Sequence, residues 1–256
     1  GGKTTLCHLI PRFYEISSGS ISVDGHDIRT VTRSSLRQKI GIVQQDVFLF
    51  TGTIFDNIAY GKLGASREEV IEAAKKANIH DYIMSLPEGY ETFVGERGVK
   101  LSGGQKRRVA IAGVIVTKPE ILVLDEPAAG LDPLGKREIM QLLHKIHKEW
   151  CKTVIIVSHD MDEISENCTR AAVFSEGKVV AEDVPARLFS RPEQLASLGL
   201  DVPFTAKIAA ALKERGVHIY SDFTSENFVE KVLEYAALCK AFAGAGETEK
   251  GGGANA

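Results

Sequence analysis

The chain has 256 residues, of which 44% are hydrophobic and 25% are charged, and its formal net charge at pH 7 is −3. This composition is that of an ordinary globular protein, and the length suffices for one large α/β domain, alone or with a smaller appendage. The small negative charge gives no electrostatic reason to expect nucleic acid as a partner, because nucleic-acid-binding proteins usually carry a basic face.

The first half of the chain predicts short helices and strands in alternation. Leu6, Leu9 and Ile10 recur at helical spacing. Ser66 and Glu69 form the capping-box pattern that precedes a helix. The expected elements are a helix over residues 4–12, a strand over 20–23, a buried strand over 40–43, and helices over 67–77 and 80–85.

The second half has clearer periodicity and predicts a mainly parallel sheet. Buried apolar strands are expected over residues 121–124 and 153–157, because uninterrupted apolar runs separated by helical segments are typical of βαβ units. Two further strands, over 171–174 and 178–181, are expected to pair across a turn. Helices are expected over residues 105–116, 134–150, 161–166, 205–215 and 225–242.

Neither a membrane span nor a disulfide framework is expected from the sequence. The four cysteines (Cys7, Cys151, Cys168 and Cys239) are far apart and show no C-x-x-C spacing, which favours reduced, mostly buried thiols in a cytosolic protein. No apolar stretch approaches the roughly 20 residues that cross a bilayer, and no signal peptide is visible. We therefore expect a membrane to be reached only through a partner or through residues outside this sequence.

The first motif, Gly2-Lys3-Thr4, matches the end of the phosphate-loop pattern G-x-x-x-x-G-K-[ST], with Gly1 as its last variable position. In such a loop, backbone N–H groups surround the phosphates, the lysine adds a charge, and the threonine hydroxyl binds Mg²⁺. We expect the first four residues of this loop to lie upstream of the sequence. An ordinary turn before a helix would also explain the string.

The second motif is a buried strand that ends in two carboxylates, Asp125 and Glu126. Successive side chains of a strand point in opposite directions. Asp125 can therefore face Mg²⁺ while Glu126 faces the water that attacks the γ-phosphate. Two solvated carboxylates at a strand end are the alternative.

The most specific motif is Leu101-Ser102-Gly103-Gly104-Gln105. Ser102 is a good N-cap, and the glycines leave the N–H groups at the helix start open to an anion, although they reduce helix stability. A simple capped helix is the alternative. At this string the chain resembles the ABC ATPase family, whose signature motif it is. The resemblance implies an ABC-type P-loop NTPase fold with a helical subdomain, in which two cassettes enclose two ATP molecules.

The same resemblance implies roles for further residues. Gln45 resembles the Q-loop glutamine that contacts Mg²⁺ and senses the membrane subunit, with Gln44 as an adjacent alternative. Asp132 resembles the aspartate between cassettes, and His159 the histidine that contacts the γ-phosphate. The implied catalytic residues are Glu126 and His159, and the implied Mg²⁺ ligands are Thr4, Gln45 and Asp125. The implied ATP-binding residues are Gly1, Gly2, Lys3, Thr4, Thr5, Gln45, Ser102, Gly103, Gly104, Gln105 and Asp132. The basic cluster Lys106-Arg107-Arg108 is interpreted as a solvated helix face.

The two halves of the chain resemble different branches of the family. Residues 1 to about 105 resemble a lipid or multidrug exporter cassette, and the strings that carry this are Arg12-Phe13-Tyr14, Val23-Asp24-Gly25, Leu49-Phe50-Thr51-Gly52-Thr53-Ile54 and the X-loop Val94-Gly95-Glu96-Arg97-Gly98. Residues from about 106 to about 242 resemble the ATPase of an energy-coupling-factor (ECF) importer, in residues 125–133, in Gly113 and in residues 195–203. Recombination or a joining artefact would produce this mosaic, and we favour the artefact.

The function expected from the sequence is ATP binding and hydrolysis that powers membrane transport, as the ATPase of an ECF-type vitamin or micronutrient importer. The alternatives are the nucleotide-binding domain of a lipid or multidrug exporter and, from another class, an inactive fragment or regulatory cassette. We expect a second ABC cassette, identical or different, and integral membrane transporter subunits as partners, at the cytoplasmic face of the cell membrane. The expected domains are a nucleotide-binding domain over residues 1–185 with a helical subdomain over about 46–116, a helical extension over 186–242, and a disordered tail over 243–256.

Overall fold

A computed structural model of the chain describes residues 2–95 and 99–245. These residues form two compact units, Gly2–His159 and Asp160 onward, and each unit is described by itself. Among the described residues, no helix is both long enough and apolar enough to span a bilayer.

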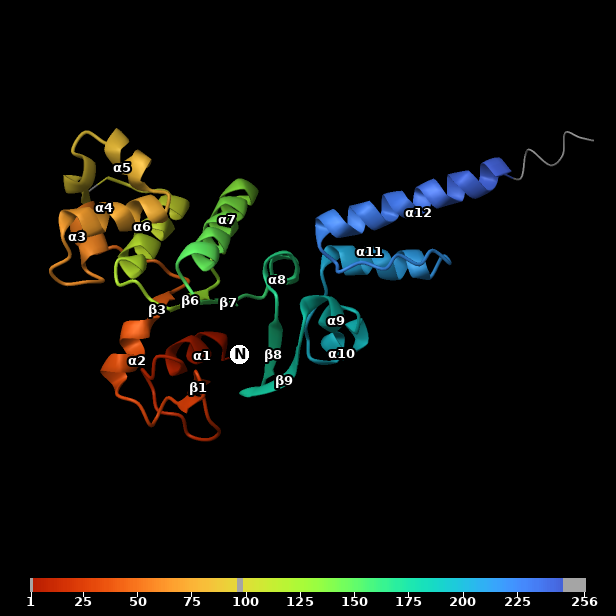
Figure 1. Ribbon diagram of the computed structural model, residues 1–256, viewed down its shortest axis with the longest axis horizontal. Coiled ribbons are helices and arrows are strands. Elements are labelled where there is room, and N and C mark those ends of the chain that lie inside the picture. Colours follow the sequence, from red (N-terminus) through yellow and green to blue (C-terminus); the bar gives the residue numbers. More distant parts are fainter. Residues whose placement is uncertain (1, 96–98, 246–256) are drawn as a thin grey trace, which may run out of the picture. The chain divides into compact units, whose positions relative to one another are not determined.

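The first unit combines a parallel sheet with helices and two small antiparallel strand pairs (Figure 1). Its strands are β1 (Ser22–Val23), β2 (His26–Asp27), β3 (Ile40–Val43), β4 (Gly52–Thr53), β5 (Phe93–Val94), β6 (Ile121–Asp125) and β7 (Thr153–Val157). Its helices are α1 (Lys3–Leu9), α2 (Arg33–Lys39), α3 (Ile54–Ala59), α4 (Arg67–Lys76), α5 (His80–Ser85), the 3-10 helix η1 (Gly89–Glu91), α6 (Gly103–Ile115) and α7 (Pro133–Glu149).

The parallel sheet has the order β3-β6-β7, so β6 lies in the centre. Successive side chains of β6 point to opposite faces of the sheet, and both faces are buried. Leu122 and Leu124 belong to a hydrophobic core shared with helices α3 to α7, whereas Val123 belongs to a second core with Cys7 of α1 and Leu36 of α2. Figure 1 shows α1 and α2 on one side of this sheet and α6 and α7 on the other. The predicted α/β class with a mainly parallel sheet is confirmed.

The end of α3 and helix α6 approach each other closely, because Gly61, two residues after α3, and Gly113 of α6 lie at the contact. A Cβ atom on Gly61 would lie 1.7 Å from the carbonyl oxygen of Gly113, and a Cβ on Gly113 would lie 3.1 Å from the carbonyl oxygen of Asn57. Since both neighbours are backbone atoms, a side chain at either position requires the two helices to separate.

Replacing Gly61 with Ala is therefore expected to destabilise the protein by about 1–3 kcal/mol, the usual effect of overpacking. Urea denaturation measures this change. Gly104→Ala is a matched control, because its added methyl group meets no atom within 4 Å and the change suits a helix. A Gly61→Ala protein as stable as the Gly104→Ala protein would contradict the close packing.

Within residues 160–245, the second unit contains a hairpin and five helices. The hairpin strands are β8 (Ala171–Ser175) and β9 (Lys178–Asp183), and they pair as the sequence predicts. The helices are α8 (Met161–Asn167), α9 (Pro185–Phe189), α10 (Pro192–Ser197), α11 (Phe204–Lys213) and α12 (Ser225–Ala245). Hydrogen bonds join α8 and α11 to the turn before α12: the hydroxyls of Ser165 and Thr205 both donate to the carbonyl of Phe223, at 3.0 and 2.6 Å.

Several elements differ from the sequence prediction. Helices α2, α3, α9 and α10 and strands β2, β4 and β5 were not expected, while α1 ends at Leu9 instead of continuing to residue 12. The predicted domain boundary near residue 185 lies between β9 and α9, inside the second unit. Of the tail predicted to be disordered over 243–256, residues 243–245 are helical, and residues 246–256 lie outside the described residues.

Candidate functional site

Two residues that are far apart in the sequence meet at the carboxyl end of β6. The chain enters α1 through Gly2, whose φ of 96° lies in the left-handed region that favours glycine. This places Thr4 in the first turn of α1, where its hydroxyl donates a hydrogen bond of 2.7 Å to Oδ2 of Asp125, 121 positions away. Asp125 is the last residue of β6 and is only 4% exposed. Two of the three residues that the sequence assigns to Mg²⁺ are thus in direct contact.

Glu126 points away from this pair, toward the end of β7. Its backbone N–H donates to the carbonyl of Val157 at 2.8 Å, and its φ of 48° is left-handed, which costs a non-glycine residue on the order of 1 kcal/mol. Its Oε1 lies 2.6 Å from Nδ1 of His159, and its Oε2 accepts a hydrogen bond of 3.4 Å from Ser158. Glu126 is buried, whereas the His159 side chain is 72% exposed. The structure thus joins the two candidate catalytic residues.

The two candidate Q-loop residues follow β3 at the same edge of the sheet. Val43, the last residue of β3, pairs with Leu124 in parallel register. Gln44, the next residue, therefore lies at the same edge of the sheet as Asp125, the last residue of β6. Nε2 of Gln44 lies 3.2 Å from Nε2 of His8 in α1, and Gln45 is exposed. Thr5, in the first turn of α1, is also exposed.

The signature residues form the start of helix α6. The Ser102 hydroxyl accepts from the Gln105 backbone at 3.2 Å, and the Gln105 side chain accepts from the Ser102 backbone at 2.8 Å, a complete capping box. Asp132 caps α7 by accepting from the Gly135 backbone at 2.6 Å. Within the chain these side chains therefore serve two helix starts, while Gly103 and Gly104 form the first turn of α6.

The interpretation of Lys106-Arg107-Arg108 as a solvated face is wrong for Arg107. Its side chain is only 6% exposed, and its Nη2 donates to the carbonyl of Gln45 at 3.0 Å. Arg107 lies one helical turn before the fully buried Ile111, so the helix directs it inward. The spacing to Ile111 and Ile115 is the sequence signal that could have identified it.

The donor set at the carboxyl end of β6 suits Mg²⁺. Adjacent ligands in an octahedral magnesium shell are about 2.9 Å apart at Mg–O distances near 2.1 Å, and the Thr4 and Asp125 oxygens lie 2.7 Å apart. No group of three or more His, Cys, Asp or Glu side chains that could hold a metal occurs within residues 2–95 and 99–245. Mg²⁺ usually takes only one or two carboxylates, together with substrate phosphates and water. Gly1, the Lys3 side chain and X-loop residues 96–98 lie outside the described residues.

Cys7 lies behind this site, on the buried side of α1. Burial, with a smaller contribution from the Asp125 charge, raises the pKa of Cys7 to about 11. The thiol is therefore protonated at neutral pH and does not act as a nucleophile. Contrary to the expectation of mostly buried thiols, Cys168 is half-buried and Cys239 is exposed.

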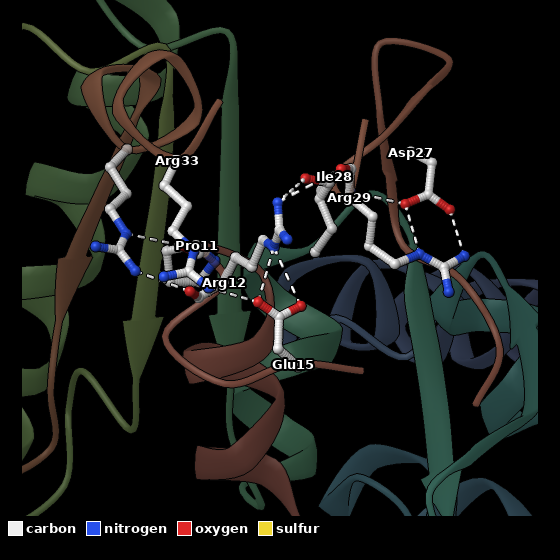
Figure 2. A network of polar contacts seen from close by, with 8 residues as sticks. Pro11, Arg12, Glu15, Asp27, Ile28, Arg29 and Arg33 are labelled. Atoms are coloured by element: carbon white, nitrogen blue, oxygen red, sulfur yellow. Dashed lines mark hydrogen bonds and ion pairs between the residues drawn. The ribbon is translucent and has the colours of Figure 1, made fainter. Parts of the chain in front are cut away.

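A polar network holds the segment that follows α1 (Figure 2). Arg12 has a left-handed φ of 57°, its Nε donates to Glu15 at 3.2 Å, and its Nη1 donates to the carbonyl of Ile28 at 3.3 Å. Hydrogen bonds from Arg33 and then Arg12 lower the pKa of Glu15, and the paired hydrogen bonds of Arg29 lower the pKa of Asp27 to about 2. The loop is thus fixed against β2 and α2 by charged hydrogen bonds.

Exposed aromatic side chains extend from this segment and from the loop after β3. Phe13 is 50% exposed and lies beneath the Arg37 guanidinium, and Tyr14 is 61% exposed. Beyond the glutamines, Phe50 packs against Phe48 and Tyr60 with ring centroids 5.6 and 4.3 Å apart. Phe48, Phe50 and Tyr60 are in mutual ring contact through Phe50, and we call these three side chains the aromatic surface. Exposed aromatic side chains that pack against one another, as these three do, commonly mark an interaction site.

Comparison with known proteins identifies the family of the chain. The family model described as ABC transporter matches residues 1–129. The chain is 46% identical over 191 residues to the ATP-dependent lipid A-core flippase of Syntrophus aciditrophicus, which covers 75% of this chain and 31% of the relative. It is 49% identical over 180 residues to a putative multidrug export ATP-binding/permease protein of Bacillus subtilis, covering 70% of this chain and 30% of the relative.

A solved structure gives the same result. The structure of a bacterial Atm1-family ABC exporter with ATP bound matches 74% of this chain and 33% of that chain, with a TM-score of 0.66 and 43% sequence identity. The chain thus spans about a third of the length of the proteins it matches. The resemblance of the N-terminal part to a lipid or multidrug exporter cassette is confirmed. The chain therefore belongs to the ABC transporter family, within which it is an ATP-binding ATPase domain.

Proposed function

We propose that this domain hydrolyses ATP to drive an exporter of lipids or drug-like molecules. The observation that carries the proposal is the 46% and 49% identity to proteins described as a lipid A-core flippase and a putative multidrug exporter. These relatives favour the exporter alternative over the ECF importer that was the main expectation. A match over 191 of 256 residues cannot lie within residues 1–105 alone, so similarity to exporters continues past the predicted junction. The importer-like string Asp125–Pro133 therefore does not by itself separate the two classes.

The proposed mechanism assigns separate roles to the two residue pairs at the carboxyl end of β6, Thr4 with Asp125 and Glu126 with His159. Thr4 and Asp125, whose oxygens lie 2.7 Å apart, would hold Mg²⁺, and Gln45 would be its third protein ligand. When bound, Mg²⁺ neutralises charge on the phosphate oxygens. The buried Glu126 carboxylate orients the attacking water or accepts its proton, and His159 holds Glu126 in place and reaches the γ-phosphate through its exposed ring. Phosphoryl transfer of this kind depends mainly on placement and electrostatics.

A second cassette would complete the site. The Ser102–Gln105 segment is the N-terminus of a 13-residue helix, and its first-turn N–H groups can bind an anion. A second copy or a related cassette would supply ATP to this helix start and to Asp132, and would receive the same contribution in return.

The aromatic surface is the proposed contact with the membrane-spanning part of the transporter. Phe48 follows Gln45 by three residues in the same loop, so a partner seated on this surface would be coupled along the chain to the Mg²⁺ end of the site. Tyr and Phe anchors of this kind often carry much of an interface's binding energy. The domain would then lie at the cytoplasmic face of the membrane, where ATP is supplied.

A domain exchange tests the exporter proposal. The ATP-binding domain of the Bacillus subtilis relative is replaced by this chain, and ATP-driven uptake of a fluorescent cationic dye is measured in inverted membrane vesicles. We expect dye uptake that the Glu126→Gln change abolishes and that Phe50→Ala with Tyr60→Ala weakens. The double change removes the ring contact of 4.3 Å and leaves the catalytic residues intact.

The outcomes of the exchange separate the proposals. ATP hydrolysis without dye uptake would contradict exporter function, and ATP binding without hydrolysis would favour the regulatory cassette. Soluble ATPase assays use the chain with a glycine and three small residues placed before Gly1, so that the loop reads G-x-x-x-x-G-K-T, with the unextended chain measured alongside.

A further inference from the structure

Arg107 is a buried charged residue to which the mechanism above gives no role. From the second turn of α6, its guanidinium reaches two loops that leave the carboxyl edge of the sheet. Nη1 donates to the carbonyls of Glu126 at 3.2 Å and Ala129 at 3.4 Å, and also to the carbonyl of Pro127. Nη2 donates to the carbonyl of Gln45 at 3.0 Å. One side chain therefore contacts both the loop after β6 and the loop after β3.

These four partners are backbone carbonyls, whose positions follow the path of the chain. A guanidinium is planar and holds its five donors at fixed angles, so it can bond to both loops only while they keep one relative position. Burying the charge of Arg107 is unfavourable unless its hydrogen bonds are made. The two loops therefore strongly prefer the relative position in which all these hydrogen bonds form. Movement of either loop away from α6 breaks these bonds.

The segments joined in this way carry the groups on which hydrolysis depends. Glu126 has the left-handed φ of 48°, and Arg107 bonds to its carbonyl and to those of the turn that follows. The Gln45 carbonyl is fixed at the start of the Q-loop. Arg107 itself is two residues after Gln105, in the helix whose first turn would meet the ATP of the second cassette.

We propose that Arg107 is a positioning residue that sets the Glu126 loop and the Gln45 loop relative to the signature helix, so that ATP at the helix start of one cassette promotes hydrolysis at Glu126 of the same chain. This inference rests on the proposed function, in which a second cassette completes the site. It differs from a role in general stability because it predicts an effect on turnover and on cooperativity between the two sites.

Arg108 provides a matched control. It is the next residue of the same helix, and its guanidinium also bonds to a carbonyl, that of Asn78 at 2.9 Å, and to Glu138 at 2.5 Å. These partners lie in the turn after α4 and in α7, apart from the Glu126 and Gln45 loops. Replacing either arginine with lysine keeps the charge and removes the planar fork.

The experiment compares Arg107→Lys and Arg108→Lys in the full chain with its phosphate loop completed. The rate of phosphate release is measured against ATP concentration, which gives kcat, KM and the Hill coefficient. We expect Arg107→Lys to lower kcat by about 10- to 100-fold, the scale of small misplacements remote from the chemistry, and to move the Hill coefficient toward 1, with KM little changed. Arg108→Lys is expected to keep kcat within about twofold, because its contacts do not reach the site.

Amide hydrogen exchange gives a readout that does not depend on activity. Exchange at residues 45–47 and 126–131 is expected to accelerate in Arg107→Lys and to stay unchanged in Arg108→Lys. Should Arg107→Lys not fold, Arg107→Gln serves as the second variant, because its amide still donates to one carbonyl. Failure of both variants to fold would show a role in stability alone and would overturn the proposal.

Two other results would also overturn it. One is an unchanged kcat in Arg107→Lys, and the other is an equal loss of activity in the two lysine variants. If the unsubstituted chain binds ATP but does not hydrolyse it, the proposed function fails first and this inference fails with it. If the unsubstituted chain hydrolyses ATP and Arg107→Lys does so equally well, the role of Arg107 is contradicted and the proposed function stands.

Discussion

Replacing Glu126 with Gln is expected to stop ATP turnover and to leave ATP binding intact. The amide keeps the size of the carboxylate and can still bond to His159, but it cannot accept a proton from the attacking water. Removing a general base usually lowers the rate by on the order of 10²- to 10⁴-fold. Phosphate release measures turnover, and a fluorescent ATP analogue measures binding in the same preparation.

Glu120→Gln is the control for this experiment, because it makes the same chemical change directly before the start of β6. Glu120 pairs with Lys39 and Lys152, and these two lysines lower its pKa to about 2, yet it lies at the strand end opposite to the site. We expect normal turnover in this variant. Unaltered hydrolysis by Glu126→Gln would remove the catalytic role from Glu126.

Replacing Asp125 with Asn is expected to abolish hydrolysis at ordinary Mg²⁺ concentrations. The amide preserves the shape of a side chain that is only 4% exposed and can still accept from Thr4, so the fold should persist. It removes the negative charge that attracts the cation. We expect the Mg²⁺ concentration for half-maximal activity to rise by at least about tenfold, because one charge at ligand distance contributes more than about 1.4 kcal/mol.

Changes at Thr4 complete this test. Thr4→Ser keeps the hydroxyl that donates to Asp125 and should retain the Mg²⁺ dependence, whereas Thr4→Val removes the hydroxyl and should resemble Asp125→Asn. An Asp125→Asn protein with the parental Mg²⁺ curve would show that the metal is held elsewhere.

Thiol titration of Cys7 reports the loss of the Asp125 charge without any nucleotide. That charge contributes to raising the pKa of Cys7 to about 11, so Asp125→Asn should lower the pKa of this thiol. The shift is downward but partial, because burial is the larger cause. Cys168, whose pKa is also raised to about 11 by burial and by Glu163, should not change.

Local sequence signals identified most of the long elements. The apolar runs predicted β3, β6 and β7, and the capping box at Ser66 predicted α4. Helix α3 was missed, although Thr53 and Asp56 form the same capping box in front of it. Its six residues are too few to display a helical period, so the cap was the only local signal.

The basic cluster after the signature string shows where local reasoning fails. Three adjacent cations suggest a solvated face, since charged side chains are seldom buried. Helical geometry instead separates them: Lys106 is exposed, Arg107 lies on the buried face of α6, and Arg108 bonds to Glu138. Only the packing of α6 against two loops supplies the carbonyls that compensate the buried charge of Arg107.

The sequence by itself determined the candidate residues and their order. Alternation along a strand also predicted that Asp125 and Glu126 point in opposite directions, although Glu126 lies beyond the end of β6 and takes its direction from a backbone with a left-handed φ of 48°. It also determined the family, through motifs whose spacing is readable along the chain. Only the tertiary structure decided which residues meet. Thr4 reaches Asp125 across 121 positions, and Glu126 reaches His159 because β6 and β7 are adjacent and parallel. Such contacts depend on sheet order and register, which arise from the packing of the two cores and not from any single segment.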